Sequence, residues 1–101
     1  MIHVIASIQV KSGQRSAFLE IFKHNMKKVK EEIGCLKYFP AVDVATGLPP
    51  QQMTPDRVTV IETWESLDAL RNHLKAPHML AYRKKVKDMV AEVTLKVLEE
   101  V

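Results

Sequence analysis

The stretch from Val58 to Met79 constrains the fold most, because it predicts a strand that runs directly into a capped helix. Side chains alternate along a strand, so one face of it would carry Val58, Val60, Glu62 and Trp64. Ser66 is a favourable N-cap, and leucines at helical spacing follow it. Pro77 either ends this helix or begins another. The segment therefore places the only tryptophan of the chain at a strand end, with two histidines just beyond it.

The remaining periodicities predict the other elements of the fold. Residues 1–10 alternate with one apolar face, as in a strand, and residues 14–32 repeat apolar side chains every three or four positions, as in an amphipathic helix. Further strands are expected at residues 35–44, 57–65 and 90–98, and a second short helix at 78–87. The order βαββαβ is that of a ferredoxin-like α+β fold. We therefore expect a single domain over residues 1–101, with a four-stranded antiparallel sheet and its helices on one face.

The face of the sheet that the helices leave uncovered is partly apolar in this prediction. Ile5 and Ile61 lie on the opposite strand faces from Val4 and Val60, so both sides of these strands carry aliphatic side chains. An uncovered apolar sheet face favours a second copy of the chain packed sheet to sheet. We expect a homodimer with twofold symmetry.

Composition excludes several classes of function. A formal net charge of +3, with few aromatic residues among the lysines, does not favour nucleic-acid binding. No apolar run is long enough to cross a membrane, and a single cysteine, Cys35, fits a reducing compartment, so a cytoplasmic protein is expected. His73 and His78 are five residues apart and do not share a helix face, so no metal site is expected. The three glycines form no phosphate-binding loop.

What remains is a small-molecule pocket near the tryptophan. Trp64, His73 and His78 could form one wall, and Tyr38 could form a rim together with Met53 from the proline-rich loop at residues 45–55. Each residue also has a purely structural interpretation. Trp64 could be a core residue, the histidines could lie on the surface, and Glu62 could pair with a lysine or a backbone group.

Several motifs resemble one known family. The segments VIETWES and HLKAPHM-x-x-Y, together with KSGQ and EEIGCLKY, are similar to those of the antibiotic biosynthesis monooxygenases, which are dimeric α+β barrels. Within that family the resemblance is closest to the bacterial quinol monooxygenases. It implies a pocket between sheet and helices, a homodimer formed through the sheets, and oxidation of a quinol or polycyclic phenol by molecular oxygen. Such members need no metal or flavin, so no cofactor is expected.

The resemblance also implies roles for individual residues. Trp64 matches the pocket tryptophan of the family, and either His73 or His78 would take the phenolic proton while Tyr38 orients the substrate. Ser7 stands near the position where haem-degrading relatives carry an asparagine, which argues against haem. Other relatives isomerise a small phosphorylated compound, so an isomerase or lyase acting on a small carbonyl compound, with or without a phosphate group, is an alternative. A non-catalytic dimer that binds a small ligand is another.

Overall fold

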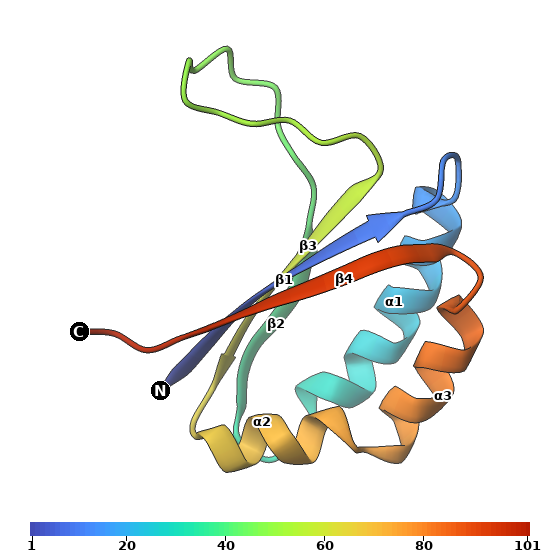
Figure 1. Cartoon of the computed structure of the whole chain (residues 1–101). Helices are drawn as coiled ribbons and strands as arrows, with labels where there is room; N and C mark the ends of the chain where they lie inside the picture. Colours follow the sequence, from blue (N-terminus) through green and yellow to red (C-terminus); the bar gives the residue numbers. More distant parts are fainter.

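A computed structural model describes the whole chain, residues 1–101, and contains the predicted elements in the predicted order (Figure 1). The bounds are β1 (Ile2–Val10), α1 (Arg15–Lys30), β2 (Cys35–Ala41), β3 (Arg57–Trp64), α2 (Leu67–Leu74), α3 (Pro77–Val86) and β4 (Val90–Leu98). The α+β ferredoxin-like fold is confirmed. No helix is long and apolar enough to cross a bilayer.

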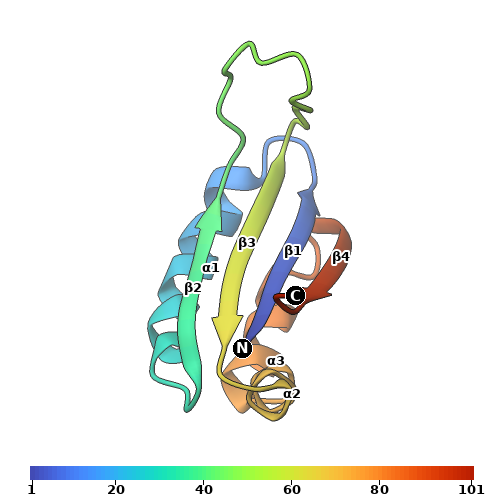
Figure 2. The ribbon, with the colours of Figure 1, turned by 90° about the vertical axis from the view of Figure 1, so that its left-hand side faces the viewer.

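The four strands form one antiparallel sheet in the order β2-β3-β1-β4, and the three helices lie on one of its faces (Figure 2). The central pair, β1 and β3, aligns Ile2 with Trp64 and Ile8 with Val58. Because side chains alternate, this register places the apolar faces of both strands on the same side of the sheet. That side is the one covered by the helices.

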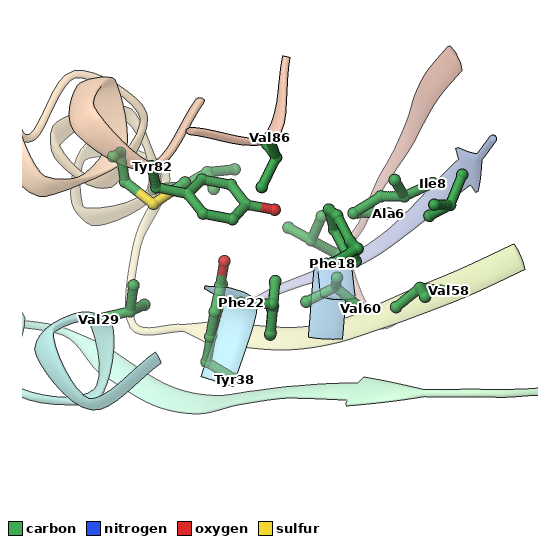
Figure 3. Close-up of a cluster of buried hydrophobic side chains, with 14 of the residues drawn as sticks. Ala6, Ile8, Phe18, Phe22, Val29, Tyr38, Val58, Val60, Tyr82 and Val86 are labelled. Atoms are coloured by element: carbon green, nitrogen blue, oxygen red, sulfur yellow. The ribbon is translucent and has the colours of Figure 1, made fainter. Parts of the chain in front are cut away.

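The core lies between the sheet and the helices that cover it. Its largest members are fully buried aromatic and aliphatic side chains, including Val4, Val10, Phe18, Phe22, Val29, Val58 and Val60 (Figure 3). Phe22 stacks on Tyr38 with ring centroids 5.4 Å apart and an interplanar angle of 7°. Burial of each large apolar side chain contributes roughly 1.5–3 kcal/mol. Packing of Phe22 on Tyr38 therefore holds α1 against β2.

The strand β2 departs from simple alternation and is shorter than predicted. It ends at Ala41 rather than Val44, and its pairing with β3 shifts register between Cys35 and Lys37. This irregularity leaves Leu36 exposed and turns Tyr38 into the core. The prediction that Leu36 and Tyr38 share a face is wrong, because the bulge breaks the alternation between them.

The connection between α1 and β2 is a tight turn that lies against α2. The helix α1 ends at Lys30, two residues before its predicted end, and Glu32 falls in the turn. Gly34 has a φ of +85°, and a Cβ at this position would lie 2.7 Å from the Cβ of Ala69. Ser66 caps α2 as predicted, since its side chain accepts a hydrogen bond from the backbone N–H of Ala69 at 3.1 Å. Glycine therefore permits the close approach of this turn to α2.

A long loop, residues 42–56, extends beyond the sheet at the end opposite α2 (Figure 1). It is held mainly by its own contacts, such as the hydrogen bond of 2.8 Å from the backbone N–H of Thr54 to Asp43 Oδ2. Met53 lies in this loop and its side chain is exposed. The loop thus contributes nothing to the core.

The last strand, β4, lies at the edge of the sheet, where the helices cover its side chains only in part. Val93, Leu95 and Val97 pair beside Ile8, Ala6 and Val4, so they are on the helix-covered side of the sheet. Each is nevertheless about half exposed, at 53%, 50% and 48%. The space between α3 and β4 is therefore open to a ligand.

Candidate functional site

A cavity of about 400 Å³ lies between the sheet and the helices α2 and α3. Twelve of its sixteen lining residues are apolar or aromatic, and the four others are Glu62, His73, Arg83 and Lys87. Glu62 and His73 are buried, whereas Arg83 and Lys87 are exposed. A mostly apolar cavity with a few polar groups is typical of small-molecule sites, which span about 300–1,000 Å³.

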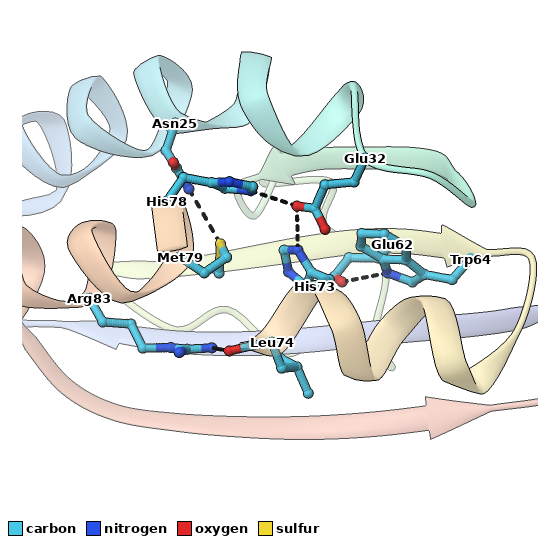
Figure 4. Close-up of polar contacts among 9 residues, drawn as sticks. All are labelled: Asn25, Glu32, Glu62, Trp64, His73, Leu74, His78, Met79 and Arg83. Carbon is cyan, nitrogen blue, oxygen red and sulfur yellow. Dashed lines mark hydrogen bonds and ion pairs between the residues drawn. The ribbon is translucent and has the colours of Figure 1, made fainter. Parts of the chain in front are cut away.

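Glu32 joins two histidines, of which His73 lines this cavity and His78 does not (Figure 4). Its Oε2 atom lies 2.9 Å from Nδ1 of His73 and 2.7 Å from Nε2 of His78. The three residues come from the α1–β2 turn, the end of α2 and the start of α3. Tight packing of the turn against α2, permitted by Gly34, brings the carboxylate within reach of both rings.

The contact with Glu32 fixes the chemistry of His73. A carboxylate accepts hydrogen bonds, so Nδ1 of His73 carries the proton and its N–H donates a hydrogen bond to Glu32. In the neutral ring, Nε2 is then an unprotonated acceptor. Burial lowers the pKa of His73, although the hydrogen bond to Glu32 opposes this change. Burial thus favours the neutral ring of His73, which lines the cavity in the tautomer that the contact with Glu32 selects.

Trp64 supports the site from behind and does not line the cavity. Its ring is fully buried, with its centroid 4.6 Å from that of His73 and 6.5 Å from that of Tyr38. The indole Nε1–H donates a hydrogen bond of 2.9 Å to Oε1 of Glu62. Trp64 thus packs against one polar group of the cavity and hydrogen bonds to another.

The carboxyl group of Glu62 is the second buried titratable group of the cavity. Desolvation raises its pKa to about 7, with the Trp64 hydrogen bond opposing the rise and the Glu32 charge adding to it. A carboxyl group with a pKa near neutrality can donate or accept a hydrogen bond within a narrow pH range. Glu62 is therefore suited to bind a ligand hydroxyl group or its anion.

Two tyrosines place their hydroxyl groups in the space between α3 and the sheet (Figure 3). The side chains of Tyr38 and Tyr82 are buried. Neither hydroxyl group has a hydrogen-bond partner in the chain, and both remain accessible from the cavity. Burial raises the pKa of both phenols well above the ordinary value, so both stay protonated. Two hydrogen-bond donors are thus available to a ligand.

The structure brings together some of the residues predicted for the site and separates others. Tyr38, Glu62 and His73 line the cavity, with Trp64 directly behind them. His78 contacts Glu32 but faces a separate small crevice on the outer side of α1 and α3.

Two of the predicted site residues lie away from the cavity. Ser7 lies on the opposite sheet face, because it alternates with Ala6 and Ile8, which do line the cavity. Met53 is in the exposed loop. Alternation along β1 and the projection of the loop remove these two residues from the candidate site.

Sequence reasoning assigned no role to Glu32 or Tyr82. Glu32 was expected only as the end of a helix, and no local pattern links it to a histidine 41 positions later. Tyr82 belongs to the HLKAPHM-x-x-Y motif, and its spacing from Met79 places both on the buried face of α3. Helical periodicity could have identified Tyr82, but not Glu32.

No group of three or more histidine, cysteine, aspartate or glutamate side chains is placed to hold a metal ion. The Glu32 cluster contains only one carboxylate and two histidines, and both rings are directed to a single oxygen of that carboxylate. This arrangement is that of a hydrogen-bonded cluster.

Comparison with known proteins identifies the family of the chain and agrees with its fold. Residues 1–85 match the family model of the antibiotic biosynthesis monooxygenases. The chain is 43% identical to "Probable quinol monooxygenase YgiN" of Escherichia coli K12, over 98% of this chain and 97% of that protein. The chain belongs to the antibiotic biosynthesis monooxygenase family, and its class of enzyme is therefore that of the monooxygenases.

Solved structures show the same fold at low sequence identity. A structure from Nitrosomonas europaea superposes with a TM-score of 0.85 at 20% identity, covering 100% of this chain and 99% of that one. The protein Rv0793 of Mycobacterium tuberculosis gives a TM-score of 0.81 at 24% identity, with 99% and 94% covered. These likenesses support the ferredoxin-like architecture across the whole chain.

Proposed function

We propose that the chain oxidises a quinol or a related polycyclic phenol with molecular oxygen, and that it does so without a metal or flavin. The observation that carries this proposal is the position of His73, a neutral histidine held by Glu32 on the wall of an apolar cavity. The similarity to a protein named as a quinol monooxygenase supports the choice of substrate class.

The first step is deprotonation of the substrate. Nε2 of His73 takes the proton of one phenolic hydroxyl group, and Glu32 stabilises the imidazolium that forms. The resulting quinolate is a much better electron donor than the quinol and reduces oxygen. Overall, one quinol and one O₂ give one hydroxylated quinone and one water. Conversion of quinol to quinone supplies two of the four electrons, and hydroxylation of a ring carbon supplies the other two.

The remaining polar groups hold the substrate during this reaction. Tyr38 and Tyr82 donate hydrogen bonds to the oxyanion, and Glu62 binds the second hydroxyl group. The apolar lining excludes water, which strengthens these interactions and protects reactive intermediates. Removal of either phenol oxygen by a Tyr→Phe change is therefore expected to lower turnover without unfolding the protein.

The test is oxygen uptake with a chemically reduced naphthoquinone, using metal-stripped protein with no flavin or nicotinamide added. Uptake is measured against spontaneous autoxidation of the same quinol. We expect uptake above this background, and a loss of about 10²–10⁴-fold in the enzymatic rate for His73→Gln, as for other general bases. His24→Gln is the matched control, because His24 is exposed on α1. Uptake equal to autoxidation for the unaltered protein would refute the proposal.

Substitution of His78 shows which of the two histidines is the base. Because His78 contacts Glu32 and not the cavity, His78→Gln should reduce the rate much less than His73→Gln. The reverse order of effects would assign the proton transfer to His78.

We also propose that two copies of the chain pair through the uncovered sheet face. On this face Ile61 lies opposite Ile5 on β1 and Phe39 on β2, which forms an apolar row across three strands. Such a row can pack on itself about a twofold axis. Sedimentation equilibrium should show a dimer that Ile61→Lys dissociates, while Leu80→Lys on α3 leaves it intact. A monomer at micromolar concentration in the unaltered protein would contradict this proposal.

A further inference from the structure

The open end of the cavity carries two cations. Arg83, in the last turn of α3, and Lys87, its C-cap, both line it, and both are exposed. The only acidic residue that lines the cavity is Glu62, which is buried. The cavity therefore combines a deep end suited to a phenol with a positively charged rim.

A general preference of helices for C-terminal cations does not explain this rim. The last turns of α3 and its C-cap carry four cations, Arg83, Lys84, Lys85 and Lys87, and all of them interact favourably with the helix dipole. Only two of the four line the cavity. The other two provide natural controls, because their charge and their position along the helix are similar.

The guanidinium group of Arg83 is held in place at the rim. Its Nη2 donates a hydrogen bond of 2.7 Å to the backbone carbonyl oxygen of Leu74, at the end of α2 (Figure 4). A guanidinium has five N–H donors in a planar fork, so others remain free for an anion. Leu74 also lines the cavity, which fixes the cation beside the apolar wall.

We propose that the preferred substrate is an aromatic quinol or phenol that bears a carboxylate, with the ring system inside the cavity and the carboxylate at the rim between Arg83 and Lys87. The inference rests on the proposed function for the identity of the ring system. A carboxylate held at the rim keeps part of its hydration, so it gains from both cations without the large cost of full burial. The apolar lining and the unpartnered tyrosine hydroxyl groups take up the ring and its oxygens.

The experiment compares two ligands that differ only in charge. One is a naphthoquinone bearing a carboxylate on a short saturated chain, and the other is its methyl ester, so the ring has the same electronic character in both. Binding of the oxidised forms is measured by isothermal titration calorimetry. We expect the acid to bind more tightly than the ester, by about two- to fivefold for each cation. Higher salt concentration should reduce this preference.

Substitutions assign the preference to the rim. Lys87→Gln should weaken binding of the acid by about two- to fivefold and leave the ester unchanged, whereas Lys84→Gln should change neither. Arg83→Gln should also weaken binding of the acid. This change also removes the hydrogen bond to Leu74. If the variant and the unaltered protein bind the ester with equal affinity, the cavity is intact.

Two outcomes would overturn the inference. One is equal affinity of acid and ester, or binding of neither, in the unaltered protein. The other is equal weakening of acid binding by Lys87→Gln and Lys84→Gln. Because calorimetry with the oxidised ligands requires no turnover, these outcomes are distinct from a failure of oxygen uptake, which would refute the proposed reaction alone.

Discussion

Glu62 gives the sharpest physical prediction, because an acidic side chain in an apolar cavity makes stability depend on pH. Desolvation raises its pKa from the ordinary 4.5 to about 7 in the folded chain. The folded state therefore binds this proton more tightly than the unfolded state does. Its contribution to stability is fully present below pH 4.5 and is lost as the pH rises through 7. The difference between the two pKa values corresponds to about 3 kcal/mol.

Replacement of Glu62 by glutamine removes this titration while keeping the shape and the acceptor for the Trp64 N–H. Between pH 4 and pH 8, the free energy of unfolding of Glu62→Gln should rise by about 3 kcal/mol relative to the unaltered protein. Urea denaturation at a series of pH values measures this difference. One protein concentration is used throughout, since the stability of an oligomer depends on concentration. Equal m values at each pH confirm that the same transition is compared.

Other carboxylates and histidines titrate in the same range, but they are common to both proteins and cancel in the difference. Glu65→Gln, at an exposed position just beyond β3, is the matched control for replacing a carboxylate by an amide. A difference between Glu62→Gln and the unaltered protein that stays constant from pH 4 to pH 8 would refute the reasoning. It would mean that the carboxylate is solvated in the folded state.

Two further predictions concern Trp64 and Gly34. The indole N–H holds the pKa of Glu62 down, so Trp64→Phe should raise that pKa above about 7. Carboxyl ¹³C chemical shifts during a pH titration measure this pKa. An unchanged pKa would show that the Trp64 hydrogen bond does not affect the titration of Glu62. Gly34→Ala should lower the free energy of unfolding by more than the roughly 1–2 kcal/mol that alanine costs in the left-handed region, because its Cβ would lie 2.7 Å from that of Ala69. Gly47 has a similar φ but lies in open space, so Gly47→Ala should lower the free energy of unfolding only by the cost of the left-handed backbone. Equal urea midpoints for the two variants would contradict this expectation.

Most of the fold could be predicted because each element carries a local signal that tertiary contacts reinforce. The alternation of Val58, Val60, Glu62 and Trp64 was sufficient to assign β3 and its buried face. The end of β2 could not be predicted in the same way. Leu36 and Tyr38 are two positions apart, so a regular strand would place them on the same face. Only the pairing with β3 shows the irregularity that exposes Leu36 and buries Tyr38.

The candidate site was less predictable than the fold, since it depends on which face of an element meets the cavity. Ser7 and Ala6 are neighbours on a strand, yet only Ala6 lines the cavity, and the choice depends on which sheet face the helices cover. For Trp64, sequence identified the correct region but could not separate a wall of the cavity from a support behind it. Its full burial against His73 decides for the support.

Glu32 shows why the central polar group of such a site escapes sequence reasoning altogether. Its carboxylate gives His73 a fixed tautomer, but the two residues are 41 positions apart, on segments joined only by the packing of a turn against α2. That packing depends on Gly34, whose own signal in the sequence is merely that of a helix stop. The chemistry of the histidine is thus determined by a close backbone approach. A change at Gly34 should therefore reduce turnover through His73 without altering any residue that contacts the substrate.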